Sequence, residues 1–269
     1  MTKIKGNCIL ITGGASGIGR IMGRMALEKG ARQLVIWDIN QESIKATEEA
    51  FSNIGSVKGY KIDVSDHDAV VKTFARTTQE CGNVDILINC AGIITSNRSF
   101  AELSQEEIDR TMAINAAAPM AIALQALPPM LERNHGHICN IASAAGFIAN
   151  PKMSVYAASK WAVIGWSDSL RVELQEAKSN VHVTTIAPYY INTGMFDGVR
   201  SRIIPILKPE WVAKKILKAI EKNKKISSWP LGYHLIRTLQ AVLPLRGLDL
   251  LCKGLGIYNA LDHFKGKKN

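Results

Sequence analysis

Cysteine is scarce in this sequence, and its spacing excludes the scaffolds that depend on it. The chain of 269 residues has five cysteines, an odd number, and none of them forms a C-x-x-C pair. A disulfide framework or a zinc site would need paired or clustered thiols. We therefore expect no metal site and a reducing, cytoplasmic location. The five are Cys8, Cys81, Cys90, Cys139 and Cys252.

Long apolar runs are also missing. No stretch reaches the roughly 18 uninterrupted apolar residues that indicate a membrane-spanning helix. The first six residues are mostly polar, and the apolar run over 7–12 is too short for the core of a signal peptide. We expect neither a spanning helix nor a secretory signal.

Acidic residues are few in the last quarter of the chain. Residues 200–269 contain 15 Lys or Arg and 4 Asp or Glu, a net charge of +11, whereas the remainder carries −1. Such an imbalance favours an anionic partner or surface for the C-terminal part. A merely solvated basic face is an equal alternative for the expected helix over 208–222.

Six short apolar runs alternate with segments of helical periodicity. Nearly continuous apolar strands separated by helices are typical of a parallel sheet covered on both faces, and right-handed crossovers make that sheet doubly wound. The sequence predicts a single α/β domain: a Rossmann-type sheet within 1–228 and a basic, leucine-rich helical extension over 229–269. The expected strands are 7–12, 33–38, 59–64, 84–89, 137–143 and 181–187.

The first strand is followed by a glycine-rich turn, TGGASGIG over 12–19. Ligands of doubly wound sheets bind beyond the carboxyl ends of the strands. Glycines at such a turn let a pyrophosphate approach the backbone N–H groups at the start of a helix. A simple strand-to-helix turn is the alternative. The residues expected to contact the cofactor here are Gly13, Ser16, Gly17, Ile18 and Gly19.

Asp38 ends the second strand and indicates which dinucleotide is bound. A carboxylate about 20 residues after the glycines accepts hydrogen bonds from ribose hydroxyls and repels a 2′-phosphate. Neither Ser16 nor Ile39 offers a basic group to that phosphate, so the sequence favours NAD over NADP. A helix N-cap role for Asp38 is less favoured, because Asn40 is better placed for it.

Tyr156 and Lys160 lie one helical turn apart in VYAASKWAV, residues 155–163. Side chains four residues apart share a helix face, so the ammonium can approach the phenol. A nearby positive charge lowers the pKa of a tyrosine, which suits it to take a proton from an alcohol. A solvated pair on an exposed face is the alternative.

These motifs together resemble the short-chain dehydrogenase/reductase family over nearly the whole chain. The T-G-x-x-x-G-x-G turn, the Asp at the end of the third strand and an NCAG sequence at 89–92 in place of the family's N-N-A-G carry the resemblance. It implies further cofactor contacts, and Cys90 is a departure from the family pattern. These contacts are Asp63, Val64, Cys90, Ala91 and Gly92.

The resemblance also implies a catalytic set, Asn115, Ser143, Tyr156 and Lys160. In this set Ser143 holds the substrate oxygen, Lys160 binds the nicotinamide ribose and Asn115 anchors a water for proton relay. In APYYINTGMF, residues 187–196, Tyr189 replaces a glycine of the family. The cofactor contacts implied there are Pro188, Ile191 and Thr193.

The tail resembles the branch that contains epidermal retinol dehydrogenases, retinol dehydrogenase 10 and the lipid-droplet 17β-hydroxysteroid dehydrogenases. That branch implies a lipophilic alcohol or ketone as substrate, and the family implies a homodimer or homotetramer built on the helices near 105–131 and 155–177. Apolar residues recur at helical spacing over 233–243 among cations. This pattern fits a peripheral membrane surface, although packing on the core or on another subunit is an equal alternative.

Three other functions remain alternatives. An NADP-dependent ketoreductase should have a basic residue near Ser16 or Ile39, and a catalytically silent nucleotide-binding protein should lack part of the catalytic set. The basic tail contains aliphatic rather than stacking residues, so we do not expect a nucleic-acid partner.

Overall fold

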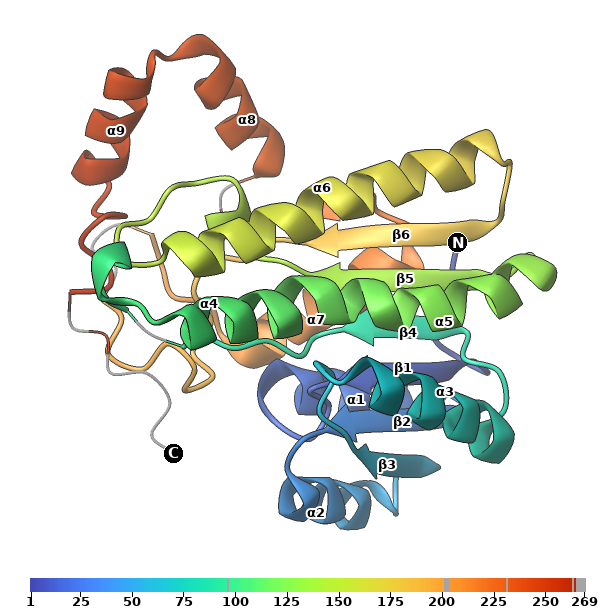
Figure 1. Cartoon of the computed structure of the whole chain (residues 1–269). Coiled ribbons are helices and arrows are strands. Elements are labelled where there is room, and N and C mark those ends of the chain that lie inside the picture. The colour runs from blue at the N-terminus through green and yellow to red at the C-terminus, as the bar shows by residue number, and fades with distance from the viewer. Residues whose placement is uncertain (96, 201–203, 231, 263, 265–269) are drawn as a thin grey trace.

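Seven strands form one parallel sheet in the computed structural model, which describes residues 1–95, 97–200, 204–230, 232–262 and 264. The strand order is β3-β2-β1-β4-β5-β6-β7, so the chain starts in the middle of the sheet and winds outward to both edges. The expected doubly wound fold is confirmed (Figure 1). The strands are β1 (Cys8–Thr12), β2 (Gln33–Asp38), β3 (Val57–Lys61), β4 (Ile86–Asn89), β5 (Gly136–Ile141), β6 (Val181–Ile186) and β7 (Ile226–Ser227).

Two strands differ from the expectation. The third strand runs over Val57–Lys61 and not over 59–64, because its register follows β2, where Leu34 pairs with Val57 and Asp38 with Lys61. Asp63 and Val64 therefore lie beyond the end of the strand. The seventh strand has two residues and extends the sheet beside β6, and a run this short gives no periodicity that a sequence could reveal.

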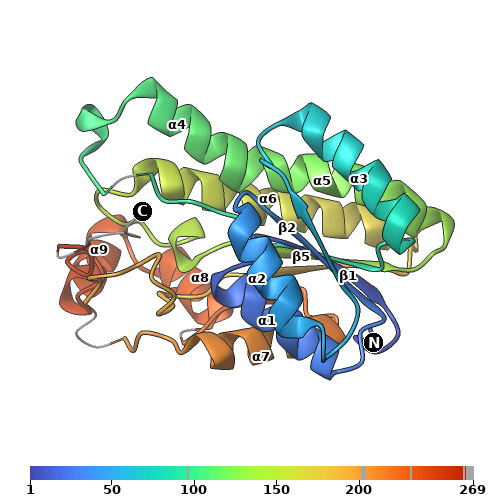
Figure 2. The same cartoon turned by 90° about the horizontal axis from the view of Figure 1, so that it is seen from below.

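Helices cover both faces of the sheet (Figure 2). Alternate side chains of β1 enter two apolar cores, Ile9 and Ile11 on one face and Cys8 and Leu10 on the other. This two-sided burial explains the continuous apolar sequence of the strand. The helices of the first face are α1 (Gly17–Glu28), α2 (Gln41–Phe51) and α7 (Pro209–Glu221); those of the second are α3 (His67–Cys81), α4 (Gln105–Met112), α5 (Ala118–Glu132) and α6 (Ser154–Glu176).

The helices α4 and α5 are joined by a π-helical turn, Ala113–Ala117, into one continuous helix. Within the described residues, this helix, Gln105–Glu132, is the one long and apolar enough to cross a membrane by length and composition. From the sequence alone we expect no membrane-spanning helix, because that expectation considers only uninterrupted apolar runs. Half of its most apolar window is buried inside the protein, and α5 packs on β4 and β5, as a core helix does.

The C-terminal extension forms a helical hairpin that stands away from the sheet (Figure 1). Its helices are α8 (Tyr233–Val242) and α9 (Leu245–Gly254). The chain then returns to the body of the protein, where Ile257, Ala260 and Leu261 are buried in the core. The extension therefore has an outlying part and an integrated part.

Candidate active site

The glycine turn after β1 leaves no room for side chains. Gly13 and Gly17 have φ angles of +64° and +51°, in the left-handed region that favours glycine. A Cβ on Gly19 would lie 2.2 Å from the carbonyl oxygen of Gly13. The loop thus presents bare backbone at the start of α1, which fits a phosphate-bearing cofactor.

A cleft of about 910 Å³ opens beside this turn, along the carboxyl ends of the first four strands. Its size and position fit a dinucleotide. Seven of the predicted cofactor contacts line it: Gly13, Ser16, Asp38, Asp63, Val64, Ala91 and Gly92. Outside that lining, among the described residues, lie Gly17, Ile18, Gly19, Cys90, Tyr156, Lys160, Pro188, Ile191 and Thr193.

Asp38 is half-buried at the end of β2 and is fixed by two backbone donors. Its carboxylate accepts hydrogen bonds from the N–H groups of Ala15 and Asn40, both at 3.1 Å. The first bond ties the carboxylate to the glycine turn. Asn40 itself caps α2, because its side chain accepts a bond of 2.8 Å from the N–H of Ser43. The expectation that Asn40 and not Asp38 caps this helix is confirmed.

The NCAG turn is held by buried polar groups. The hydroxyl of Thr12 accepts hydrogen bonds from the N–H groups of Cys90 and Ala91, each at 3.0 Å. Asn89 donates to the side chain of Asn140 at 2.8 Å, so the ends of β4 and β5 are also connected. Cys90 stabilises this turn through its backbone N–H group, and burial raises the pKa of its thiol to about 12.

Asn115 lies in the π-helical turn and reaches across to the segment after Gly92. Its side chain accepts from the N–H of Ile93 at 2.8 Å and donates to the carbonyl of Ile93 at 2.9 Å. It also donates to the hydroxyl of Ser159 at 3.2 Å. The side chain therefore holds the chain backbone, and a π-turn is a common device for re-aiming one side chain at a functional site.

Ser143 and Tyr156 come together just beyond β5. Tyr156 is buried, with 8% of its surface exposed. Burial raises its pKa to about 12, and a hydrogen bond with the side chain of Ser143 opposes this rise only in part. The sequence expectation of a lowered tyrosine pKa is thus wrong for the protein alone, because the loss of hydration outweighs the hydrogen bond with Ser143.

Lys160 is buried below the same site. Its Nζ atom donates to the carbonyl of Ile141 at 3.0 Å and lies 5.6 Å from the centroid of the Tyr156 ring. Burial lowers the pKa of Lys160 to about 8. A Cβ placed on Gly92 would lie 3.3 Å from Asn115 Oδ1 and 3.6 Å from Lys160 Nζ, so these three residues converge. Proximity of the tyrosine and lysine is confirmed.

The segment after β6 closes the other side of the site. The carbonyl of Pro188 accepts a bond of 2.9 Å from the N–H of Ala144, beside Ser143. A Cβ on Gly17 would lie 3.8 Å from the Cβ of Thr193, so Thr193 faces the glycine turn. Ile191 is buried and bridges to Leu207.

Sequence reasoning missed much of the cleft wall. Phe264 lines it from the far end of the chain, and Asn97, which also lines it, donates to the carbonyl of Leu261 at 2.9 Å. Only the folded chain brings these residues together. Ile114 could have been found from its place before Asn115. The missed residues are Trp37, Ile39, Ile62, Ile93, Ile94, Thr95, Asn97, Arg98, Glu106, Glu107, Arg110, Ile114, Met195 and Phe264.

A glycine turn, a dinucleotide-sized cleft and a half-buried serine beside a buried tyrosine and lysine define an oxidoreductase of the doubly wound class. The chain belongs to the short chain dehydrogenase family, whose model matches residues 7–203. The expected family resemblance is confirmed.

Individual relatives agree with this assignment. Epidermal retinol dehydrogenase 2 of Mus musculus is 33% identical over 99% of this chain and 87% of its own length. Retinol dehydrogenase 10-B of Danio rerio is 34% identical over the same shares. A short chain dehydrogenase/reductase from Burkholderia phymatum, solved in complex with NAD, shares the fold with a TM-score of 0.79 and 24% identity, covering 94% of this chain and 97% of that one.

Proposed function

We propose that this protein transfers hydride between NAD and a lipophilic alcohol of retinoid or steroid type, with Tyr156 as the acid/base. One observation carries the proposal: Ser143 and Lys160 both reach Tyr156 beside a dinucleotide-sized cleft. The relatives named retinol dehydrogenases support the substrate class. A catalytically silent binding protein would not need the complete catalytic set.

The choice of NAD over NADP rests on Asp38. Its carboxylate lines the cleft at the end of β2, where it repels a 2′-phosphate and accepts from ribose hydroxyls. Two arginines also line the cleft, and of these Arg98 is paired with Glu107 at 2.6 Å. Both arginines lie on or before α4 and not at Ser16 or Ile39, where an NADP-dependent ketoreductase should carry its basic residue.

The proton moves at the hydroxyl of Tyr156. In reduction of a carbonyl the protonated phenol donates its proton to the substrate oxygen, and in oxidation the phenolate accepts the proton of the alcohol. Ser143 is placed to hold the same oxygen. Lys160, fixed by the carbonyl of Ile141, stabilises the phenolate by its charge. NAD, when bound, accepts or supplies the hydride.

A screen of alcohols tests the proposed function. The full chain is incubated with NAD and retinol, hydroxysteroids, short secondary alcohols or sugars, and NADH formation is followed by absorbance. We expect turnover of the lipophilic alcohols in preference to the short ones. Tight NADH binding without turnover of any alcohol, or of any ketone in reverse, would identify a silent nucleotide-binding protein instead.

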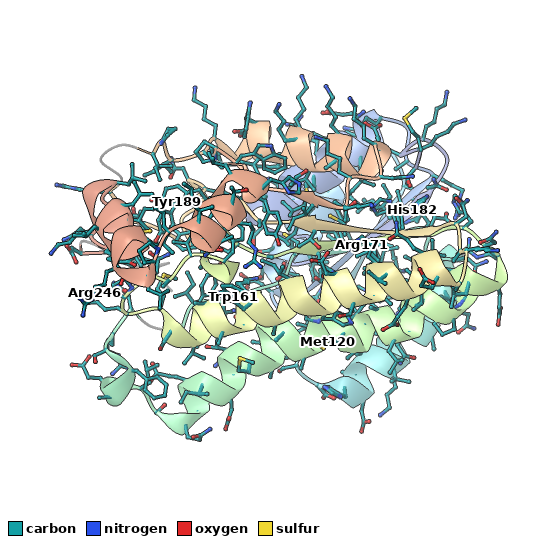
Figure 3. All side chains as sticks on the ribbon, turned by 90° about the horizontal axis from the view of Figure 1, so that it is seen from above. Met120, Trp161, Arg171, His182, Tyr189 and Arg246 are labelled. Atoms are coloured by element: carbon teal, nitrogen blue, oxygen red, sulfur yellow. The ribbon has the colours of Figure 1, made fainter. Side chains whose placement is uncertain are left out.

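The helical hairpin is proposed to rest on an anionic lipid surface, which makes the protein a peripheral membrane protein on the cytoplasmic side. Its apolar surface, called the hairpin surface below, contains side chains that are 54–79% exposed, and cations lie between them. Figure 3 shows Arg246 at the edge of the molecule on this hairpin. The hairpin surface consists of Leu235, Val242, Leu245 and Leu250, with Arg237, Arg246 and Lys253.

A homo-oligomer is proposed to form through α5 and α6, which lie side by side in Figure 3. Their outer sides carry large apolar residues that nothing in the described chain covers: Leu124 is 70% exposed and Trp161 is 44% exposed. Burial of such a surface against a second copy would remove it from water. A dimer or tetramer is the expected state.

A further inference from the structure

Tyr190 is a buried phenol that packing alone does not explain. Its side chain is 5% exposed, and among the described residues its hydroxyl has no hydrogen-bond partner. Leaving a buried hydroxyl unsatisfied destabilises a folded protein. A phenylalanine would fill the same space without that cost, so the hydroxyl group requires another explanation.

The ring of Tyr190 lies close to the catalytic tyrosine. Its centroid is 4.9 Å from that of Phe196, and Phe196 in turn lies 6.4 Å from Tyr156. Phe196 thus contacts both phenols edge to face. Tyr190 also follows Pro188, whose carbonyl is bonded to the backbone beside Ser143.

Electrostatics agree with this geometry. Burial raises the pKa of Tyr190, and the phenols of Tyr189 and Tyr156 raise it further. Tyr190 and Tyr156 are therefore within electrostatic reach of one another, and Tyr190 keeps its proton at neutral pH. It is available as a hydrogen-bond donor and not as a base.

We propose that Tyr190 is a specificity-determining residue whose hydroxyl donates a hydrogen bond to a second oxygen of the substrate, away from the reacting carbon. In the proposed mechanism Ser143 and Tyr156 bind the reacting oxygen. The ring of Phe196 contacts both Tyr156 and Tyr190, so Tyr190 is one ring further from that oxygen. Because Phe196 contacts both phenols, a substrate that reaches the Tyr190 hydroxyl has to displace the Phe196 ring. The inference rests on the proposed function and narrows its substrate class to alcohols of steroid type that carry a second oxygen, which retinol lacks.

The test compares wild type with Tyr190→Phe, which removes one oxygen atom and keeps the ring. The two substrates are an androstanediol and the androstanol with a single hydroxyl. Wild type should prefer the diol, and the ratio of kcat/KM between the two should fall about tenfold in the variant, as expected for one lost hydrogen bond to substrate. The thermal midpoint of the variant should equal or exceed that of wild type, because an unsatisfied hydroxyl has been removed.

Tyr60→Phe is the matched control. Tyr60 is equally buried, but its hydroxyl donates to Glu80 at 3.1 Å, far from the catalytic set. This control should lose stability and keep the substrate ratio. An unchanged ratio in Tyr190→Phe, or a lower thermal midpoint as in the control, would overturn the role of Tyr190.

Two outcomes separate this inference from the proposed function. Turnover of other alcohols but of neither steroid would refute the inference alone. No turnover of any alcohol or ketone by wild type would refute the proposed function and the inference with it.

Discussion

At the scale of single residues, burial decides the protonation of Tyr156 and Lys160, the proposed catalytic pair. The pKa of Tyr156 is raised to about 12 and that of Lys160 is lowered to about 8, so near pH 7 the phenol is neutral and the ammonium is mostly charged. A neutral phenol is ready to donate a proton, whereas alcohol oxidation needs the phenolate. In the protein alone, the proposed acid/base is therefore in its protonated form near neutral pH.

This charge state predicts opposite pH profiles for the two directions. For alcohol oxidation kcat/KM, which reports pKa values of the free enzyme, should rise by up to about tenfold per pH unit above neutral. The rise should weaken above about pH 8, where Lys160 loses its proton. For carbonyl reduction kcat/KM should be flat or fall over the same range. Steady-state kinetics from pH 6 to 10 check this, and an oxidation profile that falls with pH would contradict it.

Asp38 predicts the cofactor preference. Wild type should bind NADH more tightly than NADPH by about tenfold or more, about 1.4 kcal/mol. Asp38→Ala should relax the preference because it removes both the ribose acceptor and the repulsion of a 2′-phosphate. Fluorescence titration with NADH and NADPH measures the ratio of the two affinities. Asp68→Ala, on the exposed first turn of α3, is the control and should keep the wild-type ratio. Equal or tighter NADPH binding by wild type would contradict the preference for NAD.

At the scale of elements, the glycine turn and α1 are so close that a single methyl group is not tolerated. Gly19→Ala should destabilise the protein and weaken cofactor binding, because its Cβ would meet the carbonyl of Gly13 at 2.2 Å. Gly254→Ala is the control: Gly254 is exposed at the end of α9, its Cβ would meet nothing within 4 Å, and the change should leave stability and NADH binding near those of wild type. Thermal unfolding and NADH titration compare the two variants. The same thermal midpoint and NADH affinity in both would contradict the steric role of Gly19.

The elements that the sequence predicted best are those with local signals. The apolar runs located β1, β2, β4, β5 and β6 to within two residues at each end, because their buried faces leave a continuous apolar pattern. The end of β3 was wrong because Ile62 and Val64 are buried without being in the strand. The π-turn around Asn115 has no local signal, and it depends on bonds to Ile93 and Ser159 made only in the fold.

The candidate site also has features with a local sequence signal and features that depend on the fold. Glycine spacing and the Tyr156–Lys160 interval predicted residues that the fold brings to one site, but the sign of the tyrosine pKa shift depends on burial, which spacing does not reveal. Phe264 and Asn97 lie more than 160 residues apart and meet at the cleft only through the return of the chain after α9. Tertiary contact, rather than local pattern, decides such features.

At the scale of the whole molecule, the C-terminal extension is part of the body as well as a surface feature. Its end is buried at Ile257 and Leu261, and Phe264 lines the cleft. Truncation after Ser228 should therefore cost stability and cofactor binding. A substitution on the exposed hairpin separates lipid docking from folding better than truncation does.

Leu245→Glu should weaken binding to lipid without unfolding the protein, since Leu245 is 79% exposed. Wild type should sediment with anionic vesicles more than with neutral ones, and salt should release it because exposed charges are screened over about 8 Å at physiological ionic strength. Val71→Glu on the exposed side of α3 is the control and should bind as wild type does. Lipid binding unaffected by Leu245→Glu, or absent in wild type, would favour a hairpin that contacts another subunit.

Tyr156→Phe tests the central claim most directly, because it removes the transferable proton and keeps the buried ring against Phe196. Single-turnover formation of NADH from a lipophilic alcohol should fall by at least about 10²-fold, the usual loss when acid/base catalysis is removed. NADH affinity and the thermal midpoint should stay near those of wild type, because no bond to the glycine turn is lost. Hydride transfer at the wild-type rate in this variant would contradict the assignment of Tyr156 as the acid/base.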